Sequence, residues 1–133
     1  MIDVVAVALI DPGGRILLQQ RRADRQHGGL WEFPGGKVEP RETAVAGLIR
    51  EIEEELGTTV SAIEHFGRYE DEAAGDSRRV SISLYTGVLA AEPVASGEIA
   101  ELIWFGADDD TALISPSLRR QILPDLLRRG ILR

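Results

Sequence analysis

The segment between residues 42 and 55 concentrates glutamates at spacings that a helix would bring together. Glu51 and Glu54 are three residues apart, and Glu51 and Glu55 are four apart, so these side chains are neighbours on a helix. Like charges at such spacings cost an exposed helix about 0.2–0.5 kcal/mol per pair, and carboxylates in its last turns also oppose the helix dipole. Because this arrangement is unfavourable for stability alone, a bound hard cation is the chemistry that would resolve it.

Mg²⁺ is the cation that these residue types favour. It takes oxygen ligands, retains several waters and is commonly completed by substrate phosphates. Just upstream, Pro34-Gly35-Gly36 is a turn in which glycine allows close approach of the backbone, so a carbonyl oxygen can reach the same place. At this point the alternative interpretation is a solvated acidic face on an ordinary helix.

The run from Gly36 to Thr58 is more specific than the carboxylates alone. It resembles the Nudix hydrolase signature, Gly-x5-Glu-x7-Arg-Glu-U-x-Glu-Glu-x-Gly-U, where U is a bulky apolar residue. Ile52 occupies the first U position, and Thr58 is a polar but β-branched substitute at the second. Every fixed position of the signature matches, namely Gly36, Glu42, Arg50, Glu51, Glu54, Glu55 and Gly57.

The resemblance implies a set of metal ligands. The cofactor would be Mg²⁺, with Mn²⁺ as a substitute, because carboxylate and carbonyl oxygens suit hard cations. Late in the chain, residues 98–104 are similar to the family segment that often supplies a further ligand, and Glu98 is preferred there over Glu101. The expected ligands are the backbone carbonyl of Gly36 and the side chains of Glu51, Glu54, Glu55 and Glu98.

The catalytic groups that the resemblance implies are Glu51, Glu54 and Arg50. A carboxylate would orient or deprotonate the water that attacks a phosphorus of a pyrophosphate bridge. The residue that matches Glu51 has this role in MutT-like members, whereas the base differs elsewhere. Arg50 would pair with neighbouring carboxylates, Glu42 among them, because unsupported ligands would splay apart.

The segment from Leu30 to Lys37, which reads LWEFPGGK, is similar to the MutT-type entry to the signature. MutT-like members cleave a nucleoside triphosphate to the monophosphate and pyrophosphate, and we expect this reaction here. Two arginines lie on loops where such proteins contact nucleotide phosphate or base. The expected substrate contacts are Arg22, Phe33, Lys37 and Arg78.

The chain departs from the MutT pattern where the base is read. Members that hydrolyse oxidised guanine nucleotides carry an asparagine shortly after an Ala-Asp-Asp segment, and this chain has Ala107-Asp108-Asp109 but no asparagine. A site that lacks such a hydrogen-bonding group loses much of its discrimination for that base. We therefore expect a different base, such as cytosine, with Asp110 or Ser115 as the group that contacts it.

Two alternatives remain open. The first is a Nudix hydrolase of a nucleoside diphosphate derivative such as ADP-ribose, although that type tends to carry a proline where this chain has Ala74. The second is a nucleotide-sensing Nudix module without turnover. Such modules usually lose one or more carboxylates of the signature, whereas all are present here.

A single α/β domain over residues 1–133 must position these groups, and 133 residues are enough for one core. The apolar residues of 43–56 fall on one helical stripe about 100° wide, with the three glutamates on the other side and Gly57 as the end. With the resemblance, the order of elements predicts an α/β/α sandwich with a mixed β-sheet between helices. The predicted strands are 4–10, 16–18, 60–66, 80–89 and 99–105, with a loop at 19–29 and a last helix that begins near Ser115 or Ser117 and is interrupted at Pro124.

Composition limits the partners. The 22 acidic and 15 basic residues give a formal net charge of −7, which argues against polymeric nucleic acid because phosphate binding needs a surplus of Lys and Arg. We expect a monomer or homodimer that binds one small nucleotide through a cation. The longest apolar run, 4–10, is too short for a membrane helix, and the N-terminus lacks the basic region of a signal peptide, so a cytoplasmic location is expected.

Overall fold

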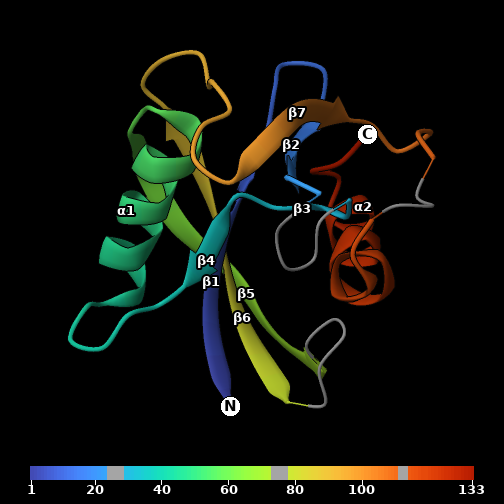
Figure 1. The fold of residues 1–133 in the computed structure, drawn as a ribbon. Coiled ribbons are helices and arrows are strands. Elements are labelled where there is room, and N and C mark those ends of the chain that lie inside the picture. The colour runs from blue at the N-terminus through green and yellow to red at the C-terminus, as the bar shows by residue number, and fades with distance from the viewer. Residues whose placement is uncertain (24–28, 73–77, 111–113) are drawn as a thin grey trace.

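The computed structural model in Figure 1 describes residues 1–23, 29–72, 78–110 and 114–133, so Ala74 lies outside the described residues. None of the described helices has the length and apolar character needed to cross a membrane. The elements in chain order are β1 (Ile2–Leu9), β2 (Ile16–Arg21), β3 (Trp31–Glu32), β4 (Gly35–Lys37), α1 (Ala44–Leu56), β5 (Val60–Glu72), β6 (Arg79–Leu89), β7 (Ile99–Phe105), the π-helical turn η1 (Leu118–Ile122) and α2 (Leu123–Arg128).

Within the described residues, the strands form two sheets. The four-stranded sheet has the order β4-β1-β6-β5; β1 runs parallel to β6 and antiparallel to β4, so this sheet is mixed, as predicted. The three-stranded sheet has the order β3-β2-β7 and is antiparallel. Helix α1 lies on one side of the molecule and η1–α2 on the other (Figure 1), which confirms the predicted α/β/α arrangement and divides its strands between two sheets.

Strand β1 separates two apolar clusters, because successive side chains of a strand point to opposite faces. Val5 and Val7 pack in the cluster that contains Leu48 and Ile52 of α1. Ala6 and Ala8 pack in the other cluster, with side chains of η1 and α2. The continuous apolar run of β1 is therefore explained by burial on both faces, as its sequence predicts.

Helix α1 begins and ends close to the predicted bounds. The Thr43 hydroxyl accepts a hydrogen bond from the Ala46 N–H, and Gly57 ends the helix in the left-handed conformation with φ 66°. One prediction about its faces is wrong, because Glu55 is buried with only 6% of its surface exposed. Glu55 lies at the border of the apolar stripe, so its carboxylate contacts strands β2 and β4 rather than solvent.

Other parts of the prediction also differ from the structure. Gly35 and Gly36, expected in a turn, lie in strand β4, which pairs with β1, and β1 itself begins at Ile2. Strand β2 continues to Arg21 instead of ending at 18, because Gln19 and Gln20 pair with β7. Strand β5 continues to Glu72 because its pairing with β6 extends that far. The last helical segment changes from π-helical to α-helical near Pro124, and Ser117 makes no capping hydrogen bond; its hydroxyl donates to Asp71 instead.

Candidate active site

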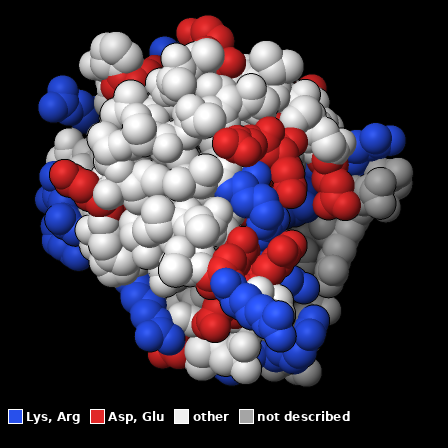
Figure 2. Space-filling model, turned by 90° about the vertical axis from the view of Figure 1, so that its left-hand side faces the viewer, with Lys and Arg blue, Asp and Glu red and all other residues white. Residues whose placement is uncertain are grey.

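A cleft of about 1020 Å³ lies between β4, the end of α1 and the start of η1. One part of its wall is acidic and carries Glu51, Glu54 and Glu55, while apolar side chains of β1 and β6 line another part together with Phe33. Figure 2, which looks onto the α1 side of the molecule, shows acidic and basic side chains gathered together beside a broad uncharged surface. The cleft thus offers a charged region next to an apolar one.

The two glycines of β4 allow the backbone and the carboxylates to approach closely. A Cβ atom on Gly36 would lie 2.5 Å from the Glu51 Cδ and 2.7 Å from both carboxylate oxygens. Gly35 has φ 147°, and a Cβ atom there would lie 2.0 Å from the Val5 carbonyl oxygen. Any larger residue would therefore displace either β1 or the Glu51 carboxylate.

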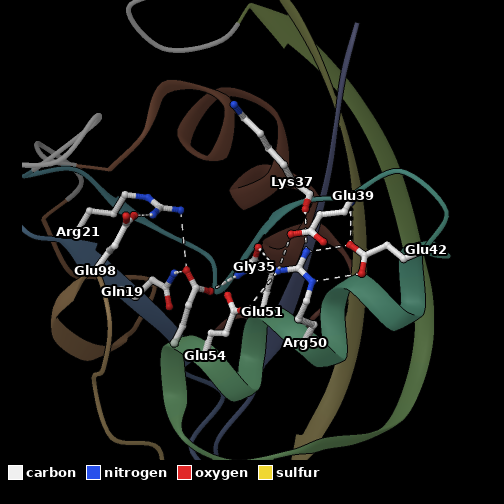
Figure 3. A network of polar contacts seen from close by, with 11 residues as sticks. Gln19, Arg21, Gly35, Lys37, Glu39, Glu42, Arg50, Glu51, Glu54 and Glu98 are labelled. Atoms are coloured by element: carbon white, nitrogen blue, oxygen red, sulfur yellow. Dashed lines mark hydrogen bonds and ion pairs between the residues drawn. The ribbon is translucent and has the colours of Figure 1, made fainter.

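Arg50 lies among the glutamates and holds several of them (Figure 3). Its guanidinium donates to both oxygens of Glu42, with Nη2 2.8 Å from Oε1 and Nε 3.2 Å from Oε2. Nη1 lies 3.0 Å from Glu51 Oε1 and 3.5 Å from Glu54 Oε1, and Nη2 also donates to the Lys37 carbonyl. Hydrogen bonding from Arg50 lowers the pKa of Glu42, so Arg50 and Glu42 form a fixed charged pair beside the other carboxylates.

Glu55 is held by donors from two different strands. The Gly35 N–H donates to Oε1 at 2.9 Å, and the Gln19 Nε2 donates to Oε2 at 2.9 Å. Burial nevertheless raises the pKa of Glu55 to about 8, and the nearby Glu51 charge adds to this rise. Burial also raises the pKa of Glu51, although Arg50 opposes the shift. A charge opposite in sign to the carboxylates is therefore favoured between these two groups.

Arg21 forms a second basic centre on the other side of the cluster (Figure 3). Its Nε lies 2.8 Å from Glu32 Oε1, its Nη1 lies 3.1 Å from Glu98 Oε2 and its Nη2 lies 3.8 Å from Glu55 Oε2. Arg21 and Gln19 were not among the predicted site residues, because their positions depend on the pairing of β2 with β3 and β7. The apolar run directly before Gln19 is the signal that could have indicated them, because a strand that begins with this run can continue through Gln19 to Arg21.

The segment before β7 brings Glu98 to the cleft by covering the end of α1. The Val94 N–H donates to the Leu56 carbonyl, and the Ser96 N–H donates to the Glu55 carbonyl. The Ser96 hydroxyl donates to the Glu54 carbonyl. These bonds satisfy carbonyl groups that a helix end leaves without partners, and they fix the residues just before Glu98 against α1.

The structure brings most of the predicted site residues together. Arg22 is exposed and does not line the cleft, and Asp110 does not line it either, whereas Ser115 does. The Lys37 ammonium group points away from the carboxylates in Figure 3, although Lys37 lies at the cleft wall. The predicted residues that line the cleft are Gly36, Glu51, Glu54, Glu55 and Glu98 of the expected metal ligands, and Phe33, Lys37 and Arg78 of the expected substrate contacts.

The donor chemistry of this cluster fits a hard divalent cation. Carboxylate oxygens are the groups such cations prefer, and Gly36 leaves its backbone open directly beside Glu51. Across the described ranges, no three His, Cys, Asp or Glu side chains are already grouped as a metal cage. Arg50 Nη1 contacts both Glu51 and Glu54 in this arrangement, so these carboxylates must turn from the guanidinium to share a cation.

Comparisons with known proteins agree with this geometry. The family model described as NUDIX domain matches residues 1–126. The chain is 48% identical over 75 residues to the CTP pyrophosphohydrolase of Escherichia coli K12, which covers 56% of this chain and 55% of that protein. It is 38% identical over 60 residues to the 8-oxo-dGTP diphosphatase of Proteus vulgaris, which covers 45% of this chain and 54% of that protein. These matches thus span about half the length of the curated relatives.

Solved structures share the fold over nearly the whole chain. The MutT NUDIX hydrolase of Burkholderia pseudomallei is 27% identical, with a TM-score of 0.78 over 89% of this chain and 92% of that one. The Escherichia coli ORF135 protein is 32% identical, with a TM-score of 0.66 over 90% of this chain and 91% of that one. The signature on α1, the family match and these neighbours lead to one conclusion: the chain belongs to the NUDIX domain family.

Proposed function

We propose that this chain is a Mg²⁺-dependent pyrophosphohydrolase that converts a nucleoside triphosphate to the monophosphate and pyrophosphate. The observation that carries the proposal is the meeting of Glu51, Glu54 and Glu55 with Gly35 and Gly36 of β4 at the wall of a cleft that also has an apolar part. Buried carboxylates with raised pKa values are unfavourable in a protein that uses them only for stability.

The metal ligands of the proposal are Glu51, Glu54, Glu55 and Glu98 with the Gly36 carbonyl, and Nudix hydrolases generally use divalent metal ions. Bound Mg²⁺ would polarise the phosphoryl oxygens, make bound water more acidic and neutralise the leaving phosphate. Cations at these carboxylates also explain how a chain with net charge −7 can bind a polyanion, because they reverse the local sign of charge.

Protein groups would prepare the attacking water and hold the cluster. Glu51 or Glu54 would accept the proton as the water attacks one phosphorus of the pyrophosphate bridge. The bond between that phosphorus and the bridging oxygen would break, and the bridging oxygen would leave on the other product. The Glu54 side chain is 60% exposed, so solvent reaches it directly. Arg50, through its paired contacts to Glu42, would keep the carboxylates from separating.

A cytidine nucleotide is the proposed preferred substrate. Phe33 and the apolar side chains of β1 and β6 offer a surface for a base. The chain has no asparagine, while Ser115 lines the cleft and can donate to or accept from a base edge. The relative from Escherichia coli named CTP pyrophosphohydrolase supports this choice. The proposed partner is one small nucleotide of the cytoplasmic pool, bound by a single domain that acts as a monomer or homodimer.

The test is a substrate panel with product identification. Purified protein in Mg²⁺ is given each ribo- and deoxyribonucleoside triphosphate, 8-oxo-dGTP and ADP-ribose, and kcat/KM is measured with chromatography of the products. The proposal expects CTP or dCTP to rank first and to yield the monophosphate and pyrophosphate. A higher kcat/KM for ADP-ribose than for every triphosphate would contradict the substrate class, and binding without hydrolysis of any nucleotide would indicate a sensing module.

A further inference from the structure

Gln19 is a fully buried polar residue inside an otherwise apolar strand. The three residues before it in β2, Ile16, Leu17 and Leu18, are at most 1% exposed, and Gln19 itself is 0% exposed. Its Nε2 donates to Glu55, but its Oε1 has no hydrogen-bond partner among the described residues. Because a buried acceptor without a partner is unfavourable, an apolar residue at this position would suit the core better.

The strand fixes where the Gln19 amide points. Gln19 pairs with Glu32 on one side and with Leu102 on the other, so its backbone lies between two neighbouring strands. Leu17, two residues earlier on the same face, packs in the cluster beneath α1. The Gln19 side chain therefore reaches the end of α1 from a rigid part of the second sheet, where Glu55 lies.

Gln19 and Gly35 hold the two Glu55 oxygens separately. The Gly35 N–H is 2.9 Å from Oε1 and the Gln19 Nε2 is 2.9 Å from Oε2, whereas the nearest Arg21 nitrogen is 3.8 Å from Oε2. A donor on each oxygen, from two different strands, fixes the plane of the carboxylate. Each oxygen can accept a further contact, which remains available to a cation.

We propose that Gln19 is a positioning residue whose amide orients the Glu55 carboxylate toward the divalent cation, with its own Oε1 left unpaired. This inference rests on the proposed function, since Glu55 is a ligand only in that account. If Gln19 acts on a metal ligand, its effect on cation binding should be separable from its effect on stability. Removing the Gln19 amide should weaken cation binding with little net change in stability, because loss of the unpaired acceptor offsets loss of the donor to Glu55.

The experiment compares Gln19→Leu with Gln20→Leu in the metal-free protein. Gln20 is adjacent on β2, but its amide donates to the Gly29 carbonyl rather than to Glu55, so it is the matched control. Mn²⁺ affinity is measured by titration with electron paramagnetic resonance, and unfolding is followed by heating. Gln19→Leu should bind Mn²⁺ about 10–100-fold more weakly with an unchanged or higher melting temperature, and Gln20→Leu should keep the wild-type affinity.

A second variant, Gln19→Met, has similar length without a hydrogen-bond donor and protects the test if Gln19→Leu does not fold. Wild-type Mn²⁺ affinity in Gln19→Met would overturn the inference, and so would a loss of affinity that follows an equal loss of thermal stability. Failure of the proposed function would look different: wild-type protein would bind Mn²⁺ but hydrolyse no nucleotide, and the Mn²⁺ comparison would still decide the role of Gln19.

Discussion

Two groups of carboxylates in this protein have opposite environments. In the cleft, burial raises the pKa of Glu55 to about 8 and also raises that of Glu51. Where β5 meets η1 and α2, a hydrogen bond from Arg120 lowers the pKa of Asp71 to about 2. The pKa of Asp125 is also lowered, chiefly by the hydrogen bond from Tyr69. Burial thus favours the neutral form of the first group, and hydrogen bonds stabilise the anionic form of the second.

The donors around each group explain the difference. Asp71 Oδ2 accepts from Arg120 at 2.7 Å and from Gln121 and Ser117 at 3.2 Å each. The Tyr69 hydroxyl donates to Asp125 at 2.8 Å. We refer to these contacts between β5 and η1–α2 as the β5 seam. At Asp71 and Asp125 the hydrogen bonds outweigh burial, whereas at Glu51 and Glu55 burial outweighs the donors that contact them. A cation between the cleft carboxylates would supply the missing positive charge.

The largest expected effect comes from removing one charge of the cleft. Glu54→Gln should lower kcat at least about 100-fold, because the variant loses a metal ligand or the base. Its melting temperature should stay unchanged, since an ion pair this exposed contributes little. Glu53→Gln, one residue earlier and exposed, is the matched control and should keep wild-type kcat. Equal activity of both variants would show that Glu54 has no part in the reaction.

Arg50→Lys should have the next largest effect. A lysine keeps the positive charge but cannot donate to both oxygens of Glu42 while it contacts Glu51. We expect kcat to fall about 10–100-fold, with a smaller change in KM for the nucleotide, as measured by steady-state kinetics. If KM rises while kcat stays at its wild-type value, Arg50 binds substrate rather than holding the carboxylates.

Mg²⁺ should stabilise the folded protein through the cleft and not through the β5 seam. At about 100 times its Kd, a ligand that binds only the folded state adds about 2.7 kcal/mol to the free energy of unfolding. Calorimetry with and without Mg²⁺ should show this rise in wild-type protein and in Asp71→Asn, and a smaller rise in Glu51→Gln. A full Mg²⁺ effect in Glu51→Gln would place the cation elsewhere.

The smallest effect belongs to the β5 seam. Asp71→Asn should lower the free energy of unfolding by about 1–2 kcal/mol and leave kcat unchanged, with the loss limited because solvent screens the 58% exposed Arg120. The pKa of Asp71 is lower in the folded state than its ordinary value of 3.8, so its contribution is present above that pH and is lost as the pH falls toward about 2. Over this pH range, the free energy of unfolding should fall less steeply with decreasing pH in Asp71→Asn than in the wild-type protein. An identical slope in both proteins would contradict the pairing with Arg120.

The parts of the fold with strong local signals could be predicted from the sequence. The apolar stripe, Thr43 and Gly57 are enough to define α1, and its signature identified the family that the comparisons confirm. The burial of Glu55 could not be predicted from periodicity alone. It depends on the Gly35 N–H and the Gln19 amide, which come from other strands and meet the carboxylate only in the folded chain.

The polar end of β2 could not be predicted for a similar reason. The apolar run ends at Leu18, yet the strand continues because β7, which lies much later in the sequence, supplies hydrogen-bond partners. Gln19 and Arg21 were therefore placed in a loop, and the structure brings both to Glu55. Local sequence patterns do not identify residues whose neighbours come from strands far away in the sequence.

The most direct test of the central claim is the release of pyrophosphate from CTP as Mg²⁺ is titrated into metal-free wild-type protein. If the crowded carboxylates of the cleft form a cation site for this reaction, release should be absent without the metal and should rise to saturation with it, leaving CMP as the other product. Release that does not depend on Mg²⁺, or CDP and inorganic phosphate as products, would contradict the account.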